Sequence, residues 1–341
     1  MVRRPSIEWE RVLGQASKQF ILPAMAAALR DLDLIGSLDG ELGAFLLAVH
    51  AANLERNDEL RDELAAAVAL LNRAGIEPVL LKGAIRLVDQ LYPDHGWRML
   101  RDLDLLVPQA KFAEAIRALE DAGYAPNSRS GNELRHPGGS VQIDLHKELF
   151  STARQVRLLP AAEMLEGSRP AAFGDGTVRL PAIEHQLAHL IGHSQIKHSG
   201  HALGRIALRD RLEAAALMRW AAESVDWQAL SLRFAAVGYR RPLIAFALSL
   251  NDGALCAVPV PARVDALTAL QQRWIAIQAR SRNVARLSFW PIWCVAMLRM
   301  QIEEREAGRP KMVRTLERLI FERGAGRRMF RTLVHGIPRP W

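Results

Sequence analysis

Three aspartates in the middle of the sequence have a spacing that suits a divalent cation. Asp102 and Asp104 stand one residue apart in the run "DLDLLV", and Asp144 lies in the later run "VQIDLH". Strand side chains alternate between the two faces of a sheet, so Asp102 and Asp104 point the same way if the first run is a strand. Carboxylates this close repel one another, and a hard cation such as Mg²⁺ or Mn²⁺ relieves the repulsion.

The later run has the same amphipathic design. Gln142, Asp144 and His146 fall on one face, and the apolar residues between them fall on the other. If the two runs are neighbouring strands, the three aspartates meet at one place, and we predict that they bind metal. Two alternatives stay open: ordinary surface polarity, and a metal-free ion-pair network in which Arg98 and Arg101 neutralise the acids.

A glycine turn precedes these acids. In "LLKGA", Lys82 and Gly83 lie between an expected strand and an expected helix. Glycine lets backbone amides approach a ligand, a helix N-terminus favours an anion, and a lysine ammonium suits phosphate. The pattern is common in α/β folds, so it indicates a phosphate site only in combination with the acids that follow.

The spacing of apolar residues and chain breakers divides the sequence into three expected segments. Residues 1–55 have the spacing of helices, residues 56–150 alternate strands with helices, and residues 151–341 read as helical with prolines as breakers. The fold class that we predict is therefore mixed α/β, or α+β. It has a small mixed sheet flanked by N-terminal helices and a large all-helical C-terminal domain.

The order "LLKG", "WRMLRDLDLLV" and "VQIDLH" resembles the nucleotidyltransferases of the DNA polymerase β superfamily. Within that superfamily it is most similar to the bacterial group of uncharacterised nucleotidyltransferases. Members of that group similarly carry a Leu-Lys-Gly turn and an arginine four residues before the Asp-x-Asp, which is Arg98 here. The resemblance is most specific over residues 76–107 and extends to 141–146. It departs from the wider superfamily at Ala84, where serine or glycine usually follows the glycine.

The resemblance implies a polymerase β-like core and a reaction. Asp102, Asp104 and Asp144 would hold two Mg²⁺ or Mn²⁺ ions, with Asp144 also acting on the acceptor hydroxyl. Lys82 and Gly83 would hold the phosphates of a nucleoside triphosphate. The enzyme would transfer a nucleoside monophosphate to a hydroxyl of a peptide, protein, sugar or small molecule and release pyrophosphate. The alternative is an inactive member of the fold that serves as a binding or adaptor protein, for instance for a peptide natural product.

The nucleotide-binding residues that we predict are Lys82, Gly83, Arg98, Arg101, His146 and His193. The last of these belongs to the run "EHQLAHLIGH", where His185, His189 and His193 recur every fourth residue on one helix face. This spacing can bind a transition metal, and it also fits a helix that faces the catalytic cleft. We favour contact of His193 with the acceptor or the nucleotide.

Composition sets the remaining expectations. The chain has 341 residues, a net charge of +8, no secretory signal pattern and only two cysteines, so we expect a cytoplasmic protein. Residues 311–341 hold eight Lys or Arg against two Glu. Such a basic segment can contact an anionic partner, or it can be a solvated helix face.

Overall fold

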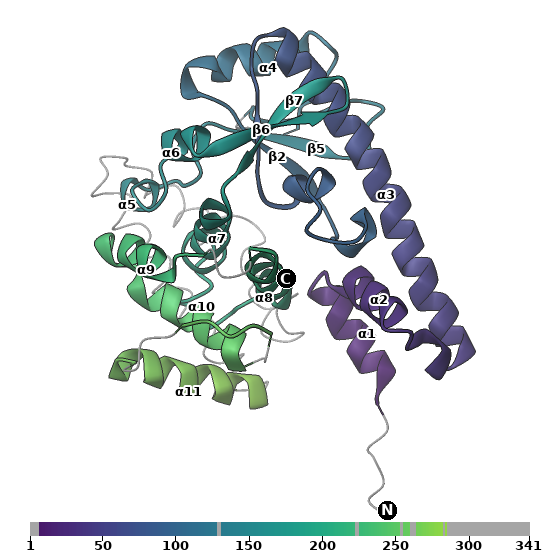
Figure 1. Cartoon of the computed structure of the whole chain (residues 1–341), viewed down its shortest axis with the longest axis vertical. Helices are drawn as coiled ribbons and strands as arrows, with labels where there is room; N and C mark the ends of the chain where they lie inside the picture. Colours follow the sequence, from purple (N-terminus) through teal and green to yellow (C-terminus); the bar gives the residue numbers. More distant parts are fainter. Residues whose placement is uncertain are drawn as a thin grey trace, which may run out of the picture. The chain divides into compact units, whose positions relative to one another are not determined.

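The chain forms two compact units, which are described separately. The first holds the described residues up to Glu148 together with Ala161–Gln186, and the second holds Leu149–Pro160 and the described residues from Leu187 onward. The computed structural model describes residues 7–127, 131–221, 225–252, 255–259, 264–281 and 284. The expected boundaries after residues 55 and 150 stay a prediction. One helix, α3, is continuous across the first of them (Figure 1).

A seven-stranded mixed sheet forms the centre of the first unit (Figure 1). Its strand order is β3-β4-β5-β2-β1-β7-β6. The strands are β1 (Val79–Leu80), β2 (Asp102–Leu106), β3 (Ala125–Pro126), β4 (Glu133–Arg135), β5 (Gln142–His146), β6 (Ser168–Phe173) and β7 (Gly176–Pro181). This architecture confirms the predicted mixed α/β fold class.

The two acidic runs are neighbouring strands, as the sequence predicts. Strand β2 pairs in parallel with β5, and the register places Asp104 directly beside Asp144 and Asp102 beside Gln142. Strand β1 pairs with β2 on its other edge in the antiparallel direction. The Asp-x-Asp strand is therefore central in the sheet, and both its neighbours help to fix its position.

The first unit also contains α-helices and 3₁₀ helices. They are the α-helices α1 (Trp9–Lys18), α2 (Leu22–Asp31), α3 (Gly40–Arg73), α4 (Phe112–Glu120) and α6 (Ala161–Glu166), and the 3₁₀ helices η1 (Ile35–Ser37), η2 (Lys82–Leu87), η3 (His95–Trp97) and η4 (Gln109–Lys111). The long helix α3 begins after Asp39, whose side chain caps it by accepting a hydrogen bond from the Glu41 amide at 3.0 Å.

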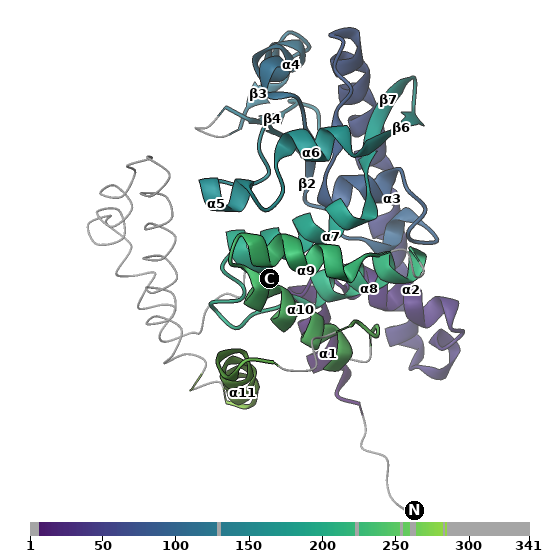
Figure 2. The same cartoon turned by 60° about the vertical axis from the view of Figure 1, so that its left-hand side comes forward.

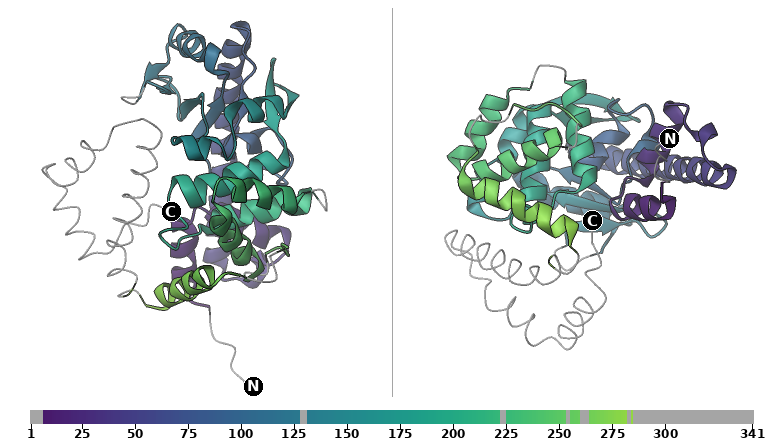
Figure 3. Two further views of the ribbon diagram at one scale, coloured as in Figure 1. Left: turned by 90° about the vertical axis from the view of Figure 1, so that its left-hand side faces the viewer. Right: turned by 90° about the horizontal axis from the view of Figure 1, so that it is seen from below.

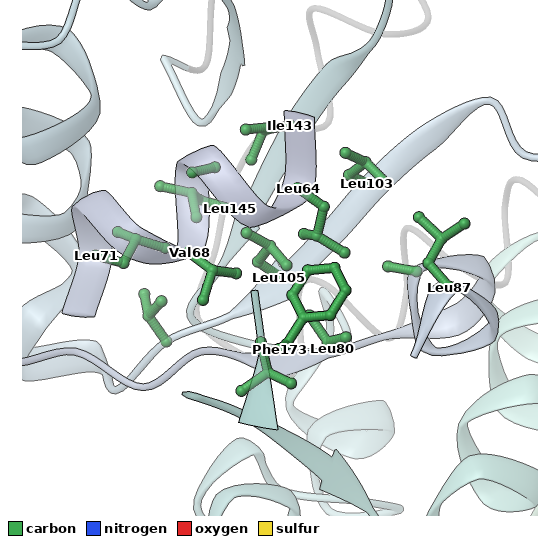
Figure 4. Packing of buried hydrophobic residues seen from close by; sticks show 14 of the residues in the cluster. Leu64, Val68, Leu71, Leu80, Leu87, Leu103, Leu105, Ile143, Leu145 and Phe173 are labelled. Atoms are coloured by element: carbon green, nitrogen blue, oxygen red, sulfur yellow. The ribbon is translucent and has the colours of Figure 1, made fainter. Parts of the chain in front are cut away.

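The leucine face of the two acidic strands builds the core. Leu103 and Leu105 from β2, together with the apolar residues of β5, pack against Leu64, Val68 and Leu71 of α3 (Figure 4). Burying each such side chain contributes about 1.5–3 kcal/mol. Because strand side chains alternate, this burial directs the aspartates to the opposite face of the sheet.

A β-hairpin corrects the expectation that only helices follow residue 151. Strands β6 and β7 pair in antiparallel fashion, and β7 joins the main sheet alongside β1. The two residues between them are Gly174 and Asp175, and Gly174 has a φ of +55°. Glycine at the first position of a two-residue loop is typical of a type II′ turn, which closes a hairpin. Each strand contains a proline, and prolines disfavour the prediction of a strand, so the hairpin is not evident from the sequence.

The segment after the glycine turn is also shorter than expected. The sequence suggests an ordinary helix, whereas the structure forms the six-residue 3₁₀ helix η2, which starts at Lys82 itself. A phosphate site formed by the N-terminus of a regular α-helix is therefore not present at this turn. The amides near Gly83 and the ammonium of Lys82 are what the turn offers to an anion.

The second unit is helical where the structure describes it. Helix α10 contacts α8, α9, α11 and the π-helical segment η5 (Figure 2). The α-helices are α5 (Ala153–Val156), α7 (Ile183–Ile191, whose first residues belong to the first unit), α8 (Leu208–Trp220), α9 (Trp227–Ala236), α10 (Arg240–Asp252) and α11 (Ala266–Arg280), and η5 spans Gly192–Lys197. Figure 3 shows the later helices of this unit, in green to yellow, in two further views.

One expectation concerns a part of the chain beyond these elements. The basic segment 311–341, with its expected anionic partner, lies outside the described residues. Among the helices that the structure describes, none is long and apolar enough to cross a membrane.

Candidate active site

Asp104 and Asp144 form the centre of the site. They are paired across β2 and β5, and the Asp104 side chain is 1% exposed. Asp102 lies two residues earlier on the same face and is exposed to solvent. The structure therefore brings together one buried and one half-buried carboxylate, with a third at the exposed end of the same strand.

His146 connects the two central acids. Its Nε2 lies 2.7 Å from Asp104 Oδ1 and 3.2 Å from Asp144 Oδ2. The sequence places His146 on the same face as Asp144, and the parallel register then carries it to the end of β2, opposite Leu106. The predicted site residue His146 is thus in direct contact with the predicted acids.

Lys82 reaches the same carboxylate from the other neighbouring strand. It follows β1, where the Leu81 amide donates to the Asp104 carbonyl at 3.0 Å, and its Nζ forms an ion pair with Asp104 Oδ1. The backbone of Lys82 has a φ of +50°. This left-handed conformation costs a residue other than glycine about 1–2 kcal/mol, and such strain persists where the surrounding structure enforces it.

The pKa values of the two aspartates of β2 shift in opposite directions. Burial by itself would raise the pKa of the Asp104 carboxyl, but Lys82 and His146 hold it well below its usual range. Partial desolvation and the nearby charge of Asp104 raise the pKa of Asp102. Burial opposes the charged form of His146, but its hydrogen bonds to Asp104 and Asp144 outweigh this and raise its pKa.

Asn132 is a site residue that the sequence analysis missed. Its Nδ2 donates to Asp144 Oδ1 at 2.6 Å, from the residue just before β4. The strand pairing of Glu133 with Asp144 sets this position. The sequence signal is weak, because a polar side chain next to a strand faces the acids only in one register of the pairing, and a shift by one residue would turn it away.

Three side chains can hold a metal ion together. Among the described residues, the ligand atoms of Asp104, Asp144 and His146 lie within 4.8 Å of one another. Two carboxylates suit Mg²⁺ or Mn²⁺, and the imidazole extends the range toward transition metals. This donor set fits a divalent cation. It includes His146 and leaves out Asp102, whereas the set predicted from the sequence has Asp102 in place of His146.

Helix α3 holds the loop that leads into the Asp-x-Asp strand. Asn57 is fully buried and donates to the carbonyls of His95 at 2.6 Å and Arg98 at 2.7 Å. Asn53 donates to the Gly96 carbonyl at 2.8 Å, and Arg56 donates to a carbonyl of the same loop, that of Leu100. Polar residues on the buried face of a long helix were the sequence signal for this clamp, and the sequence analysis did not use it.

The same loop contains a second set of polar contacts. Asp94 accepts hydrogen bonds from Arg30 and the Gly96 amide, and its Oδ1 also lies 3.0 Å from His50 Nε2. Burial opposes the charged form of Asp94, but Arg30 and His50 outweigh this and lower its pKa. The loop before β2 is therefore tied to both α2 and α3.

Gly83 is required by close packing. A Cβ at this position would lie 2.2 Å from Cδ2 of Leu100, which is itself buried. The glycine thus allows the chain to pass close to the residue that enters the Asp-x-Asp strand. This is a packing role, and the predicted role of Gly83 in holding phosphate stays a prediction.

The two flanking arginines contact a backbone carbonyl and an aromatic ring. Arg98 donates to the Met99 carbonyl at 2.7 Å, and the guanidinium carbon of Arg101 lies 5.5 Å from the centre of the Phe20 ring. The cations that pair with Asp104 are Lys82 and His146. The charge of Arg101 also partly offsets the rise in the pKa of Asp102, so the ion-pair network that the sequence leaves open as an alternative stays a prediction, with Lys82 and His146 as further members.

His193 lies in the second unit. Helix α7 ends at Ile191, so His193 falls in the π-helical segment η5 and not on the regular helix face that the sequence suggests. Its ring lies 5.8 Å from that of His189, and its Nε2 lies 3.2 Å from Nε2 of His198. Contact of His193 with a nucleotide or acceptor stays a prediction.

A mixed sheet that sets an Asp-x-Asp strand beside a second acidic strand matches the core expected of a nucleotidyltransferase. The chain belongs to the uncharacterised nucleotidyltransferase family, whose sequence model matches residues 5–252. Comparison with curated proteins gives no match. A similar solved structure is that of an antigenic nucleotidyltransferase-like protein from Paracoccidioides brasiliensis. It is 18% identical, and the match covers 57% of this chain and 93% of that chain with a TM-score of 0.34.

Proposed function

We propose that the protein is a metal-dependent nucleotidyltransferase. It transfers a nucleoside monophosphate from a nucleoside triphosphate to a hydroxyl of a peptide, protein, sugar or small molecule, and it releases pyrophosphate. The observation that carries the proposal is the side-by-side placement of Asp104 and Asp144 on parallel strands. Membership of the uncharacterised nucleotidyltransferase family supports it.

The residues that would hold Mg²⁺ or Mn²⁺ are Asp104 and Asp144, with Asp102 at the exposed end of β2 and His146 as a further ligand. When bound, the metal supplies charge that stabilises the attacking and leaving oxygens of phosphoryl transfer. A site of this kind works by positioning and electrostatics, so rigid placement of its side chains matters more than covalent chemistry.

Other residues of the site would position the acceptor and the nucleotide. Asp144 is oriented by Asn132 and orients the acceptor hydroxyl, whose proton it can accept. Lys82 carries a positive charge beside the acids and binds the phosphate chain. Arg98 and Arg101 lie on the segment that leads into β2, and we propose that they approach the nucleotide from there.

Pyrophosphate release tests the proposal. Purified protein with Mg²⁺, each of the four common nucleoside triphosphates, and peptide, protein or sugar acceptors should release pyrophosphate. Changing Asp102→Asn together with Asp104→Asn should abolish this release. Asp121→Asn, an exposed aspartate directly after α4, removes the same kind of charge elsewhere and should leave the rate unchanged. Release that survives the double substitution would contradict the proposal.

Calorimetry separates the enzyme from the adaptor alternative. An active enzyme binds nucleotide with Mg²⁺ and turns it over. A protein that binds nucleotide in the same way but releases no pyrophosphate with any acceptor fits a binding protein without turnover. Absence of metal-dependent nucleotide binding at millimolar Mg²⁺ would contradict the enzyme and favour the adaptor alternative.

A further inference from the structure

One oxygen of Asp104 has two nitrogen partners. Oδ1 forms an ion pair with the Lys82 ammonium, and His146 Nε2 lies 2.7 Å from the same atom. The Asp104 side chain is 1% exposed, whereas that of Lys82 is 26% exposed. The carboxylate is thus buried and fixed in the sheet, while the lysine that neutralises it keeps access to solvent.

This ion pair stands where a metal would bind. Asp104, Asp144 and His146 form the group of described side chains that fits a divalent cation, and Lys82 lies on a ligand atom of that group. A divalent cation on Asp104 and the ammonium of Lys82 carry charges of the same sign. In a buried site such charges repel strongly, so the ammonium on Asp104 Oδ1 competes with a metal for this carboxylate.

The backbone gives Lys82 a defined place beside the acid. Leu81 is hydrogen-bonded to the Asp104 carbonyl, and Lys82 adopts a φ of +50° immediately after it. The Lys82 backbone therefore lies close to Asp104 in every conformation of the Lys82 side chain. The long flexible side chain lets the ammonium move to another anion nearby without any change in the sheet.

We propose that Lys82 is an internal cation that occupies Asp104 in the nucleotide-free protein and moves to the phosphate chain when the metal enters with the nucleotide. The inference rests on the proposed function of the site. It makes metal and triphosphate bind cooperatively, because the triphosphate gives the displaced ammonium a new partner. Such coupling is reciprocal, so each ligand raises the affinity for the other by the same factor.

Binding of Mn²⁺ alone tests the inference without any turnover. Titration followed by electron paramagnetic resonance compares the wild type with Lys82→Met and Lys82→Gln. We expect both variants to bind Mn²⁺ at least tenfold more tightly, because the competing ammonium is gone. Lys111→Met is the matched control, since Lys111 pairs with Glu114 on the surface and its loss should leave Mn²⁺ affinity unchanged.

The phosphate arm uses inorganic tripolyphosphate, which carries the phosphate chain without a base. Its affinity is measured with and without Mn²⁺ in each protein, and chelation in solution contributes equally to all of them. We expect the enhancement by Mn²⁺ to be at least tenfold smaller in the Lys82 variants than in the wild type. Circular dichroism shows which variants are folded. Two Lys82 variants are used so that the comparison can still be made if one of them does not fold.

The outcomes separate this inference from the proposed function. Mn²⁺ affinity that is unchanged or weaker in folded Lys82 variants overturns the inference, and so does an undiminished enhancement. If neither the wild type nor the variants bind Mn²⁺, with or without tripolyphosphate, the metal site of the proposed function is refuted and the inference falls with it.

Discussion

Asp104 and Asp144 are direct neighbours on parallel strands, although they are 40 positions apart in the sequence. Both point to the face of the sheet opposite the leucine core. His146 Nε2 lies within hydrogen-bonding distance of both carboxylates, and Asn132 and Lys82 add one contact each. The pair is thus held from three strands or their ends, which is the kind of rigid support that a site for phosphoryl transfer needs.

Loss of Asn132 should reduce activity without unfolding the protein. Asn132→Ala removes the hydrogen bond that orients Asp144, and loss of such a supporting partner typically lowers activity about 10- to 100-fold. The rate of pyrophosphate release measures the effect. Asn127→Ala is the control, because Asn127 makes a comparable but exposed hydrogen bond to Gln142. Equal losses in both variants would argue against a special role for Asn132.

Loss of Asn57 should weaken both stability and activity. Asn57→Ala leaves the buried carbonyls of His95 and Arg98 without this donor, which costs about 1–3 kcal/mol of unfolding free energy. The loop into β2 then loosens, and pyrophosphate release falls. Urea denaturation gives the free energy. Glu59→Ala, on the exposed side of α3, should change neither quantity, and a stability change no larger than in this control would contradict the clamp.

Asp94 should make stability depend on pH in the acidic range. Its folded-state pKa is lowered, so the stability that it contributes is complete above its unfolded pKa of about 3.9 and is lost as pH falls through the folded value. We therefore expect Asp94→Asn to be less stable than the wild type at pH 7, with a difference that shrinks below about pH 4. Urea denaturation between pH 3 and 7 measures this. A difference that stays constant over that range would be inconsistent with the contacts to Arg30 and His50.

Gly83 and Leu100 should be coupled in a double-mutant cycle. Gly83→Ala forces the buried Leu100 side chain to move, and such overpacking costs about 1–3 kcal/mol of unfolding free energy. In Gly83→Ala with Leu100→Ala the clash is gone, so the combined loss of stability should be smaller than the sum of the single losses. Strict additivity would show that Gly83 is needed for another reason.

The sequence alone determined the chemistry of the two strands. Side chains alternate between the two faces of an extended chain, so spacing alone predicts that Asp102 and Asp104 share one face of their strand and that Asp144 and His146 share one face of theirs. The order of the motifs then indicated the family, and the family model confirmed it.

Only the tertiary structure decided which side chains complete the site. The ion pair of Lys82 with Asp104, the hydrogen bond from Asn132 to Asp144 and the clamp of Asn57 join residues that are 12 to 41 positions apart. Such contacts depend on strand order, register and helix packing, which act over the whole sheet and leave little trace in local spacing. For the same reason the sequence placed Lys82 and His146 among the site residues but did not show that both contact Asp104, which strand register decides.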